Sequence, residues 1–168
     1  MTLDELNRLP EPEAYQWFKS CCESTTWSRF MAQTRPYTSV EQIKIVATEK
    51  WPSLTDDDYL EAFKAHPMIG DIKTLEAKYA NTSGLAEQEQ ASAIGADPMV
   101  LEELHRLNHL YLEKNHFIFI ICATGQSAEN MLAAIKERIH NDTKTEIALA
   151  AQQQLKIALL RIEKGLNA

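Results

Sequence analysis

Residues 117–123 read Phe-Ile-Phe-Ile-Ile-Cys-Ala, and this short run decides between the fold classes open to the chain. Its aromatic and β-branched residues favour an extended backbone. It is the one stretch of this kind in the sequence, so it has no partner strand with which to form a sheet. We therefore expect residues 117–123 to form a single buried extended segment between helices.

Patterns typical of helices lie on both sides of this segment. Apolar residues recur every three or four positions, which places them on one face of an α-helix. Such stripes run from Ala14 to Cys21, from Ile43 through Ile45 and Val46 to Trp51, from Val100 to Tyr111, from Met131 to Ile139 and from Ile147 to Ile162. In the last stripe, the residues expected to face the core are Ile147, Ala151, Leu155, Leu159 and Ile162.

Signals that start helices are frequent. Thr2 with Glu5, and Ser39 with Gln42, have the spacing of a capping box, in which each side chain bonds to the other residue's backbone N–H. Thr55 is followed by three aspartates, which places a hydroxyl cap and negative charge where the helix dipole favours both. Prolines that follow Glu11 and Asp97 suit the first turn of a helix.

The composition agrees with a helical protein. The 168 residues include only 5 Gly and 6 Pro, too few turn formers for an all-β sandwich or barrel of this length. No repeat, linker or low-complexity stretch divides the chain. We predict an all-α fold, a single-domain bundle of about eight helices over residues 1–168, with one buried extended segment at 117–123.

Charge and cysteine content limit the partners and the compartment. The 24 acidic and 17 basic residues give a net charge of −7, which argues against a general nucleic-acid binder. The longest apolar run, residues 117–123, is too short to cross a membrane, and the first residues do not resemble a signal peptide. Three cysteines, two of them adjacent, indicate reduced thiols, so we expect a cytoplasmic protein.

His66 is the first candidate for chemistry. A helix over residues 56–65 should end before His66-Pro67, because proline disfavours helical backbone at the preceding residue. The dipole at a helix C-terminus favours a protonated imidazole, and a rigidly held histidine suits general acid–base catalysis. The alternative is a histidine that only caps the last carbonyls of the helix, which is the commoner role for this local pattern.

Two further regions allow more than one interpretation. The polar run Ser83-Gly84-Leu85-Ala86-Glu87-Gln88 could bind a urea-like ligand through backbone amides and a carboxylate, or form a solvated acidic first turn of a helix. Arg161 lies among apolar neighbours. Its side chain either points inward to a carboxylate or oxyanion, or extends outward to solvent.

A metal site receives less support. Glu102, His105 and His109 have helical spacing, but a di-iron site needs two more inward-facing glutamates, which the sequence does not show. We therefore expect surface pairs here and no metal. Two alternative functions stay open, a metal-dependent helical oxidase that uses these three residues and a non-catalytic helical binding module.

Several motifs follow one another in an order that is similar to that of one known family. The motifs are Arg35-Pro36-Tyr37, Phe63 with His66-Pro67, Glu87-Gln88, Asn108-x-x-Tyr111-x-x-Lys114, Phe117-x-Phe119-Ile120-x-Cys122-Ala123-x-Gly125 and Arg138-x-x-Asn141. Over about residues 12–166, the chain resembles the 2-oxo-4-hydroxy-4-carboxy-5-ureidoimidazoline (OHCU) decarboxylases. The resemblance implies an all-α homodimer that converts OHCU to (S)-allantoin in urate degradation, without a metal or organic cofactor.

The same resemblance implies roles for individual residues. His66 would be the catalytic acid, assisted by Glu87 and Arg161. The substrate would be held, largely through backbone groups, by Pro67, Ser83, Gly84, Leu85, Ala86, Gln88, Phe119, Ile120, Ile121, Cys122 and Ala123. The chain departs from the family at two places: Gly84, beside Ser83, stands where the family often has serine, and Asn115-His116 replaces a usual Phe-Gly.

Overall fold

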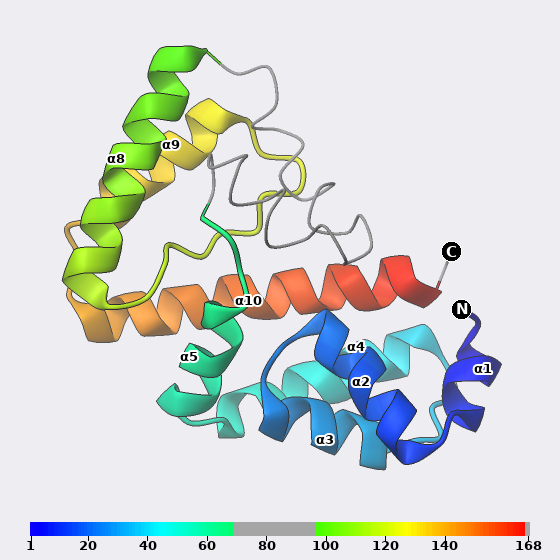
Figure 1. Ribbon diagram of the computed structural model, residues 1–168. Coiled ribbons are helices and arrows are strands. Elements are labelled where there is room, and N and C mark those ends of the chain that lie inside the picture. Colours follow the sequence, from blue (N-terminus) through cyan, green and yellow to red (C-terminus); the bar gives the residue numbers. More distant parts are fainter. Residues whose placement is uncertain (69–96, 167–168) are drawn as a thin grey trace. The chain divides into compact units, whose positions relative to one another are not determined.

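The computed structural model describes residues 1–68 and 97–166 (Figure 1). The described residues form eight α-helices, one 3-10 helix and no strand, which confirms the predicted all-α class. The helices are α1 (Leu3–Arg8), α2 (Glu11–Cys21), α3 (Thr25–Gln33), α4 (Val40–Lys50), η1 (Trp51–Ser53), α5 (Asp56–Lys64), α8 (Pro98–Asn115), α9 (Ala128–Arg138) and α10 (Thr143–Leu166).

The chain divides into two compact units. The first comprises Met1–Ala62 together with Gln154–Ala168, and the second comprises Phe63–Gln153. None of the described helices is long and apolar enough to cross a membrane. The organisation of residues 1–168 as one domain stays a prediction.

An aromatic cluster forms the core of the first unit, where α2 packs against α3. Phe18 and Trp27 are fully buried, and their rings meet edge to face at a centroid distance of 6.1 Å. Tyr37 and Trp51 extend the cluster at 6.2 Å from Phe18 and 6.3 Å from Trp27, respectively. These edge-to-face contacts add to the free energy gained from burying the rings.

Arg35 joins the ends of two helices in the first unit. Its Nη1 atom donates to the carbonyls of Leu6 (2.6 Å) and Leu9 (2.8 Å), and its Nε atom donates to the carbonyl of Ala32 (2.9 Å). These carbonyls belong to the last turns of α1 and α3, where backbone acceptors lack partners and the helix dipole favours a cation. The Arg35-Pro36-Tyr37 motif therefore has a structural role in this chain.

Most of the predicted helix starts are confirmed. Thr2 and Glu5 form both bonds of a capping box. The Ser39 hydroxyl accepts from the Gln42 backbone N–H as predicted. The predicted second hydrogen bond, from the Ser39 backbone N–H to the Gln42 side chain, is not formed. The Gln42 side-chain oxygen accepts instead from the backbone N–H of Thr38, at 2.6 Å, and from the Thr38 hydroxyl, at 3.0 Å.

The second unit contains α8 and α9, which pack side by side, and the segment that joins them (Figure 1). Residues 117–123 have no regular secondary structure. Phe117, Phe119, Ile120 and Ala123 are each 5% exposed or less, so the prediction of a buried extended segment is confirmed. A turn closes the segment at Gly125, whose φ of +76° suits a residue without a Cβ atom.

His116 ends α8 in a left-handed backbone conformation, with φ of 64°. Its backbone N–H donates to the carbonyl of Leu112 at 2.8 Å, a bond typical of left-handed helix ends. The preceding Asn115 is buried and bonds to the Tyr111 carbonyl and the Thr143 hydroxyl. Asn115-His116 thus makes the turn into the segment without a glycine.

One detail of the predicted apolar stripes is wrong. In α4, Ile45 is 50% exposed, because Ile43 and Ala47 occupy the buried face. In α10, Ile147, Leu155 and Leu159 are half-buried, and Leu155 and Leu159 pack against the core of the first unit as predicted. The buried face of α10 lies about one position earlier and includes the polar residues Glu146 and Gln154, together with Ala150, Ala151, Ile157, Ala158 and Ile162.

Candidate functional site

The end of α5 holds the first candidate residue. The helix ends at Lys64, and the backbone N–H of His66 donates to the carbonyl of Phe63 at 3.2 Å. The prediction that the helix stops before His66-Pro67 is therefore confirmed. The His66 side chain is partly exposed and Pro67 is buried, which leaves the imidazole accessible on a fixed backbone.

An aromatic contact connects this helix end to the extended segment. Phe63 is fully buried, and its ring lies 5.3 Å from that of Phe117, the first residue of the segment. The Phe117 ring also meets Tyr111 of α8 edge to face, at 5.7 Å. Two candidate regions far apart in the sequence, His66-Pro67 and Phe119–Ala123, are thereby joined through packed side chains within the second unit.

Two side chains hold the backbone of the segment. The Nη1 atom of Arg138 donates to the carbonyl of Ile120 at 2.8 Å, and the Oε1 atom of Gln153 accepts from the backbone N–H of Cys122 at 3.1 Å. Ile121, between them, makes no hydrogen bond to the part of the chain that the structure describes. An extended segment without a neighbouring strand has backbone groups that can bind a polar ligand.

A buried ion pair supports Arg138. Its Nε atom lies 2.9 Å from Oε1 of Glu146, whose side chain is fully buried. The hydroxyl of Tyr111 donates to the same oxygen at 2.6 Å, and the Asn141 amide donates to Oε2 at 2.9 Å. Burial and the hydrogen bond to the Glu146 carboxylate raise the pKa of Tyr111, so this hydroxyl keeps its proton and acts as a donor.

The sequence interpretation missed this network. Tyr111, Arg138 and Asn141 belong to the motifs that carry the family resemblance, but no role was assigned to them. Glu146 was not identified at all. The sequence offered one signal for the pair. Glu146 comes one position before the apolar stripe that starts at Ile147 and eight residues after Arg138.

The remaining predicted site residues lie either outside the described residues or in the first unit. Ser83, Gly84, Leu85, Ala86, Glu87 and Gln88 lie outside the described residues. Arg161 belongs to the first unit, where its partly buried guanidinium donates to the carbonyl of Cys21 at 3.4 Å.

The thiol of Cys22, in the first unit, is not a reactive group. Cys22 is fully buried, and burial raises the pKa of its thiol to about 12, although the positive charge of Arg161 acts in the opposite direction. The thiol is therefore protonated at neutral pH and is a poor nucleophile. Cys21, Cys22 and Cys122 form no disulfide.

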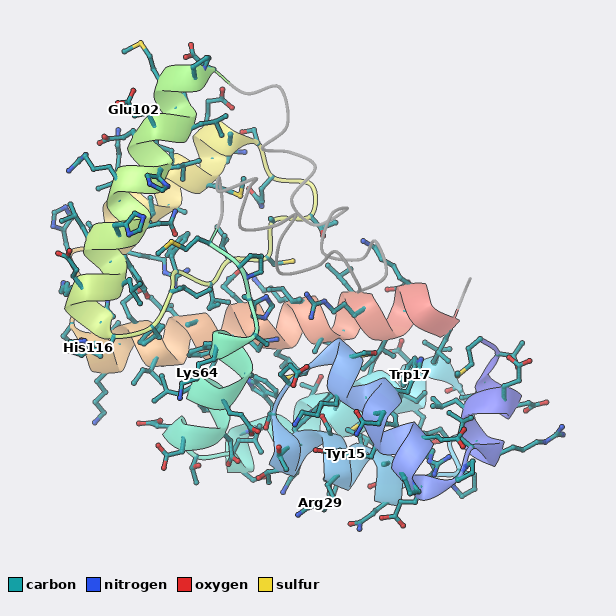
Figure 2. All side chains as sticks on the ribbon, in the orientation of Figure 1. Tyr15, Trp17, Arg29, Lys64, Glu102 and His116 are labelled. Carbon is teal, nitrogen blue, oxygen red and sulfur yellow. The ribbon has the colours of Figure 1, made fainter. Side chains whose placement is uncertain are left out.

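The residues considered for a metal site all lie on the surface of α8. Glu102, His105 and His109 are exposed, and Figure 2 shows Glu102 projecting away from the helix. The two histidine rings stack edge to face at 4.5 Å. Within residues 1–68 and 97–166, no three His, Cys, Asp or Glu side chains are close enough together to hold a metal ion.

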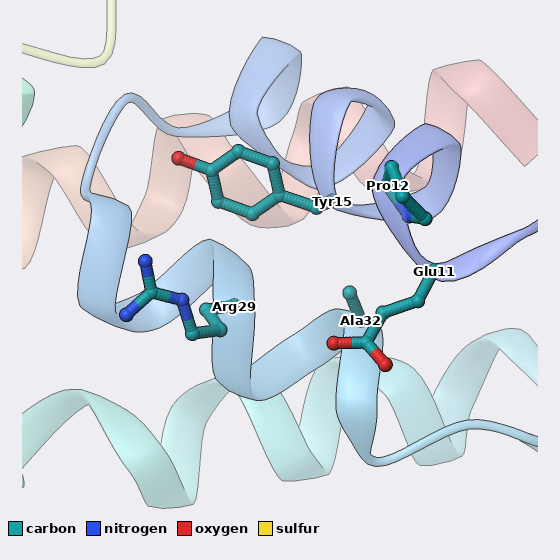
Figure 3. Close-up of a pocket in the computed structure, with 5 residues that line it drawn as sticks. All are labelled: Glu11, Pro12, Tyr15, Arg29 and Ala32. Atoms are coloured by element: carbon teal, nitrogen blue, oxygen red, sulfur yellow. The ribbon is translucent and has the colours of Figure 1, made fainter.

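A shallow pocket of about 350 Å³ lies on the first unit, between α2 and α3 (Figure 3). It is lined by Glu11, Pro12, Tyr15, Arg29 and Ala32. None of these residues was a candidate from the sequence, and the lining combines one carboxylate with one guanidinium on an exposed surface. The pocket gives no reason to move the candidate site away from the second unit.

The chain is similar in sequence to one protein family and to several curated relatives. The sequence model of the OHCU decarboxylase family matches residues 7–163. The uric acid degradation bifunctional protein TTL of Arabidopsis thaliana is 38% identical over 151 residues, which cover 89% of this chain and 46% of that protein. The 2-oxo-4-hydroxy-4-carboxy-5-ureidoimidazoline decarboxylase of Haloferax volcanii is 25% identical over 163 residues, which cover 96% of this chain and 94% of that protein.

A solved structure is also similar. The crystal structure of OHCU decarboxylase in the presence of (S)-allantoin superimposes with a TM-score of 0.74 and 34% sequence identity, covering 92% of this chain and 99% of that one. The chain spans less than half of the Arabidopsis protein and 32% of a bifunctional relative from Bacillus sp. (strain TB-90).

Proposed function

This chain belongs to the OHCU decarboxylase family, and from that membership we propose that it decarboxylates OHCU to (S)-allantoin in urate degradation. The observation that carries the proposal is the extent of the family match. Residues 7–163 include every residue to which the sequence analysis assigned a catalytic role, namely His66, Glu87 and Arg161.

The substrate chemistry explains why few catalytic groups are needed. The carbon that bears the carboxylate also bears a hydroxyl and adjoins a ring C=N unit. When the bond to the carboxylate breaks, carbon dioxide leaves and the electron pair delocalises into that unit. The substrate thus contains its own electron acceptor, so we propose a reaction without a metal or organic cofactor.

The protein must then orient the carboxylate and deliver a proton to one face of the resulting carbanion-like centre. We assign that proton to His66, either directly or through a relay. Its fixed backbone at the end of α5 and its accessible ring support this assignment. Glu87 binds the substrate hydroxyl or orients His66, and Arg161 stabilises negative charge on oxygen.

The substrate is bound on one side by the polar backbone groups of Phe119–Ala123. A ureido group has both donors and acceptors, and it is therefore complementary to an extended backbone, whose peptide groups alternate N–H and C=O. Pro67 and residues 83–88 complete the proposed substrate contacts.

The test generates fresh OHCU from urate with the enzymes that precede this step and follows allantoin by circular dichroism. We expect faster formation than in buffer, with the (S) enantiomer in excess. Racemic allantoin formed at the uncatalysed rate would overturn the proposed function. Full activity after removal of metals supports the cofactor-free reaction, whereas activity that is lost and restored by adding one metal would contradict it.

The role of His66 is tested separately in the same assay. General acid catalysis contributes on the order of 10²–10⁴-fold, so His66→Asn should lose most turnover while its far-ultraviolet circular dichroism is unchanged. His109→Asn, a substitution of an exposed histidine on α8, is the matched control and should keep full activity. Unchanged turnover in His66→Asn would refute its role as the acid.

We also propose a cytoplasmic homodimer with no nucleic-acid partner. The net charge of −7 supports the absence of a nucleic-acid partner. The absence of a disulfide among the three cysteines supports a reducing compartment. Light scattering coupled to size-exclusion chromatography measures the mass directly. A single species near 38 kDa, about twice the 19.1 kDa chain, supports the dimer, and a 19.1 kDa species contradicts it.

A further inference from the structure

We propose that Arg138 and Gln153 are positioning residues that hold the peptide groups of Ile121 in place for the ureido part of the substrate. The inference rests on the proposed function, because it assumes that the segment Phe119–Ala123 binds OHCU. It assigns a task to two side chains that the sequence analysis left without one.

The geometry fixes the segment on both sides of Ile121. Arg138 holds the carbonyl of Ile120 at 2.8 Å, and Gln153 holds the N–H of Cys122 at 3.1 Å. Ile121 itself is partly exposed, and its backbone makes no hydrogen bond to the described residues. Its N–H belongs to the same planar peptide group as the Ile120 carbonyl, and its C=O to the same group as the Cys122 N–H. Holding those two atoms therefore fixes the direction of one donor and one acceptor of Ile121, which a ureido group can pair with.

Arg138 has the geometry of a rigid support. Its guanidinium lies 4.4 Å from the centre of the Phe119 ring, while Nε contacts Glu146 and Nη1 contacts the Ile120 carbonyl. The planar guanidinium thus makes three different interactions at once, and only 12% of the side chain is exposed. Lysine could not reproduce this arrangement, because its ammonium is a single point charge on a flexible chain.

The counter-charge is itself immobilised. Glu146 is fully buried, and its two carboxylate oxygens receive hydrogen bonds from Arg138, Tyr111 and Asn141. Every one of these groups lies within the second unit. The support for Ile121 is therefore a connected hydrogen-bond network, which restricts the motion of the groups it contains.

The experiment compares variants that remove the support with a matched surface control. In Arg138→Met/Glu146→Leu both charges are removed together, so no unpaired buried charge is left. The control, Arg106→Met/Glu103→Leu, makes the same substitutions in an exposed ion pair on α8 with N–O distances of 2.7 and 2.8 Å. Arg138→Lys is the single variant that keeps the positive charge.

A second pair of variants examines the other side of Ile121. Gln153→Leu removes the acceptor for the Cys122 N–H, and Gln153→Glu keeps one. We expect faster hydrogen exchange at Cys122 in Gln153→Leu than in Gln153→Glu. We also expect Gln153→Glu to recover most of the activity that Gln153→Leu loses.

Misplacement of a bound substrate by about 1 Å can cost on the order of 100-fold in rate. We expect kcat/KM to fall about 10- to 100-fold in Arg138→Met/Glu146→Leu and in Arg138→Lys, with a reduced excess of (S)-allantoin. The control should stay within about twofold of the wild type. A purely structural role would instead lower the fraction of folded protein and leave the enantiomeric excess of the product unchanged.

The outcomes separate this inference from the proposed function. A wild-type chain without turnover overturns both. An active wild type, together with a folded double variant that keeps its kcat/KM and its enantiomeric excess, overturns the inference alone. If the double variant does not fold, the Arg138→Lys, Gln153→Leu and Gln153→Glu variants test the inference by the same two measurements, kcat/KM and enantiomeric excess. Arg138→Lys keeps the positive charge, Gln153→Glu keeps an acceptor, and Gln153→Leu removes only a neutral group, so each should fold.

Discussion

The interior of the first unit differs in kind from that of the second. Among the described residues, the buried side chains of the first unit are all uncharged, with the aromatic cluster around Phe18 and Trp27 at the core. The second unit buries the carboxylate of Glu146 against Arg138. Apolar packing depends little on direction, whereas an ion pair in a protein interior needs its partners at defined angles and distances.

The difference in buried charge between the units matches the kind of backbone that each unit contains. The first unit packs regular helices, whose backbone groups bond within each helix. The second contains seven residues of extended chain that have no neighbouring strand among the described residues, and their backbone groups need side-chain partners. Arg138 and Gln153 supply two of those partners. In this protein the buried ion pair of Arg138 and Glu146 therefore occurs where the backbone is irregular, at residues 117–123. Mutations can test this difference between the units.

The largest effect is expected where the ion pair is broken on one side. Arg138→Met leaves the carboxylate of Glu146 buried without its counter-charge, which should lower the free energy of unfolding by about 3–5 kcal/mol. Urea titration at pH 7 measures the change. The double variant Arg138→Met/Glu146→Leu should recover most of the loss, because no isolated charge remains. Equal stability of the single variant and the wild type would contradict the contrast between the units.

A comparison within α4 tests the apolar interior of the first unit. Ile43 is fully buried and Ile45 is 50% exposed, so the same substitution samples a core and a surface position of one helix. Ile43→Ala should cost about 2–5 kcal/mol and Ile45→Ala less than about 0.5 kcal/mol. Similar losses at both positions would show that Ile45 is covered in solution.

Local patterns predicted most of the helix boundaries, and the two regions show why. The helix boundaries at Thr2, Thr55 and His66-Pro67 depend on backbone groups within four residues of each signal. The neighbouring sequence is therefore enough to predict them. The extended segment was equally predictable, because its composition differs from everything around it. In α4, the position of Ile45 was wrong because the stripe from Ile43 to Trp51 fits helical spacing only loosely.

The site was less predictable than the fold. The pairing of Arg138 with Glu146 crosses the junction between two helices, and the same residues at this spacing on a surface would look identical in sequence. Burial decides between the two cases, and burial depends on the rest of the fold. The positions of Glu146 and Gln154 on the buried face of α10 were missed for the same reason, since an apolar stripe carries no information about buried polar residues.

Arg35 provides an exception that sharpens the contrast, because it is a charged residue that holds the first unit together. Arg35→Met removes four hydrogen bonds to carbonyls at the ends of α1 and α3, those of Leu6, Asn7, Leu9 and Ala32. We expect a loss of about 1.5–3 kcal/mol in the free energy of unfolding, as for hydrogen bonds to charged groups. Chemical denaturation measures it, and Arg8→Met, at an exposed arginine, should change stability little. Equal small changes in both variants would argue against this role.

His116 offers a substitution that should stabilise the second unit. A side chain in the left-handed conformation costs about 1–2 kcal/mol, and glycine removes that cost but loses more entropy on folding. His116→Gly should therefore raise the free energy of unfolding by about 0.5 kcal/mol. Thermal melts of His116→Gly and His116→Ala distinguish the cause, because alanine keeps the Cβ atom and should give no gain. A gain with alanine would point instead to the imidazole.

The smallest effect concerns acid stability of the first unit. Hydrogen bonds from the hydroxyl of Thr26 and from the backbone and hydroxyl of Thr55 lower the pKa of Asp58 below its usual value of 3.8. A lowered pKa in the folded state means that ionised Asp58 stabilises the protein above about pH 4, and that this contribution is lost as the pH falls through the folded pKa. Unfolding free energies of wild type and Asp58→Asn should converge as the pH falls through the folded pKa of Asp58. A constant difference at all pH values would refute the linkage.

Arg138 holds a main-chain oxygen of residue 120, not a side chain. This hydrogen bond therefore does not depend on which apolar side chain occupies position 120, provided that its volume suits the surroundings. A protein engineer who wishes to reshape the lining of the segment can exchange Ile120 for valine, leucine or methionine and leave the anchor intact. Residue 138 does not tolerate such exchanges, because a basic side chain without a guanidinium, such as lysine, would lose the hydrogen bond to the Ile120 carbonyl.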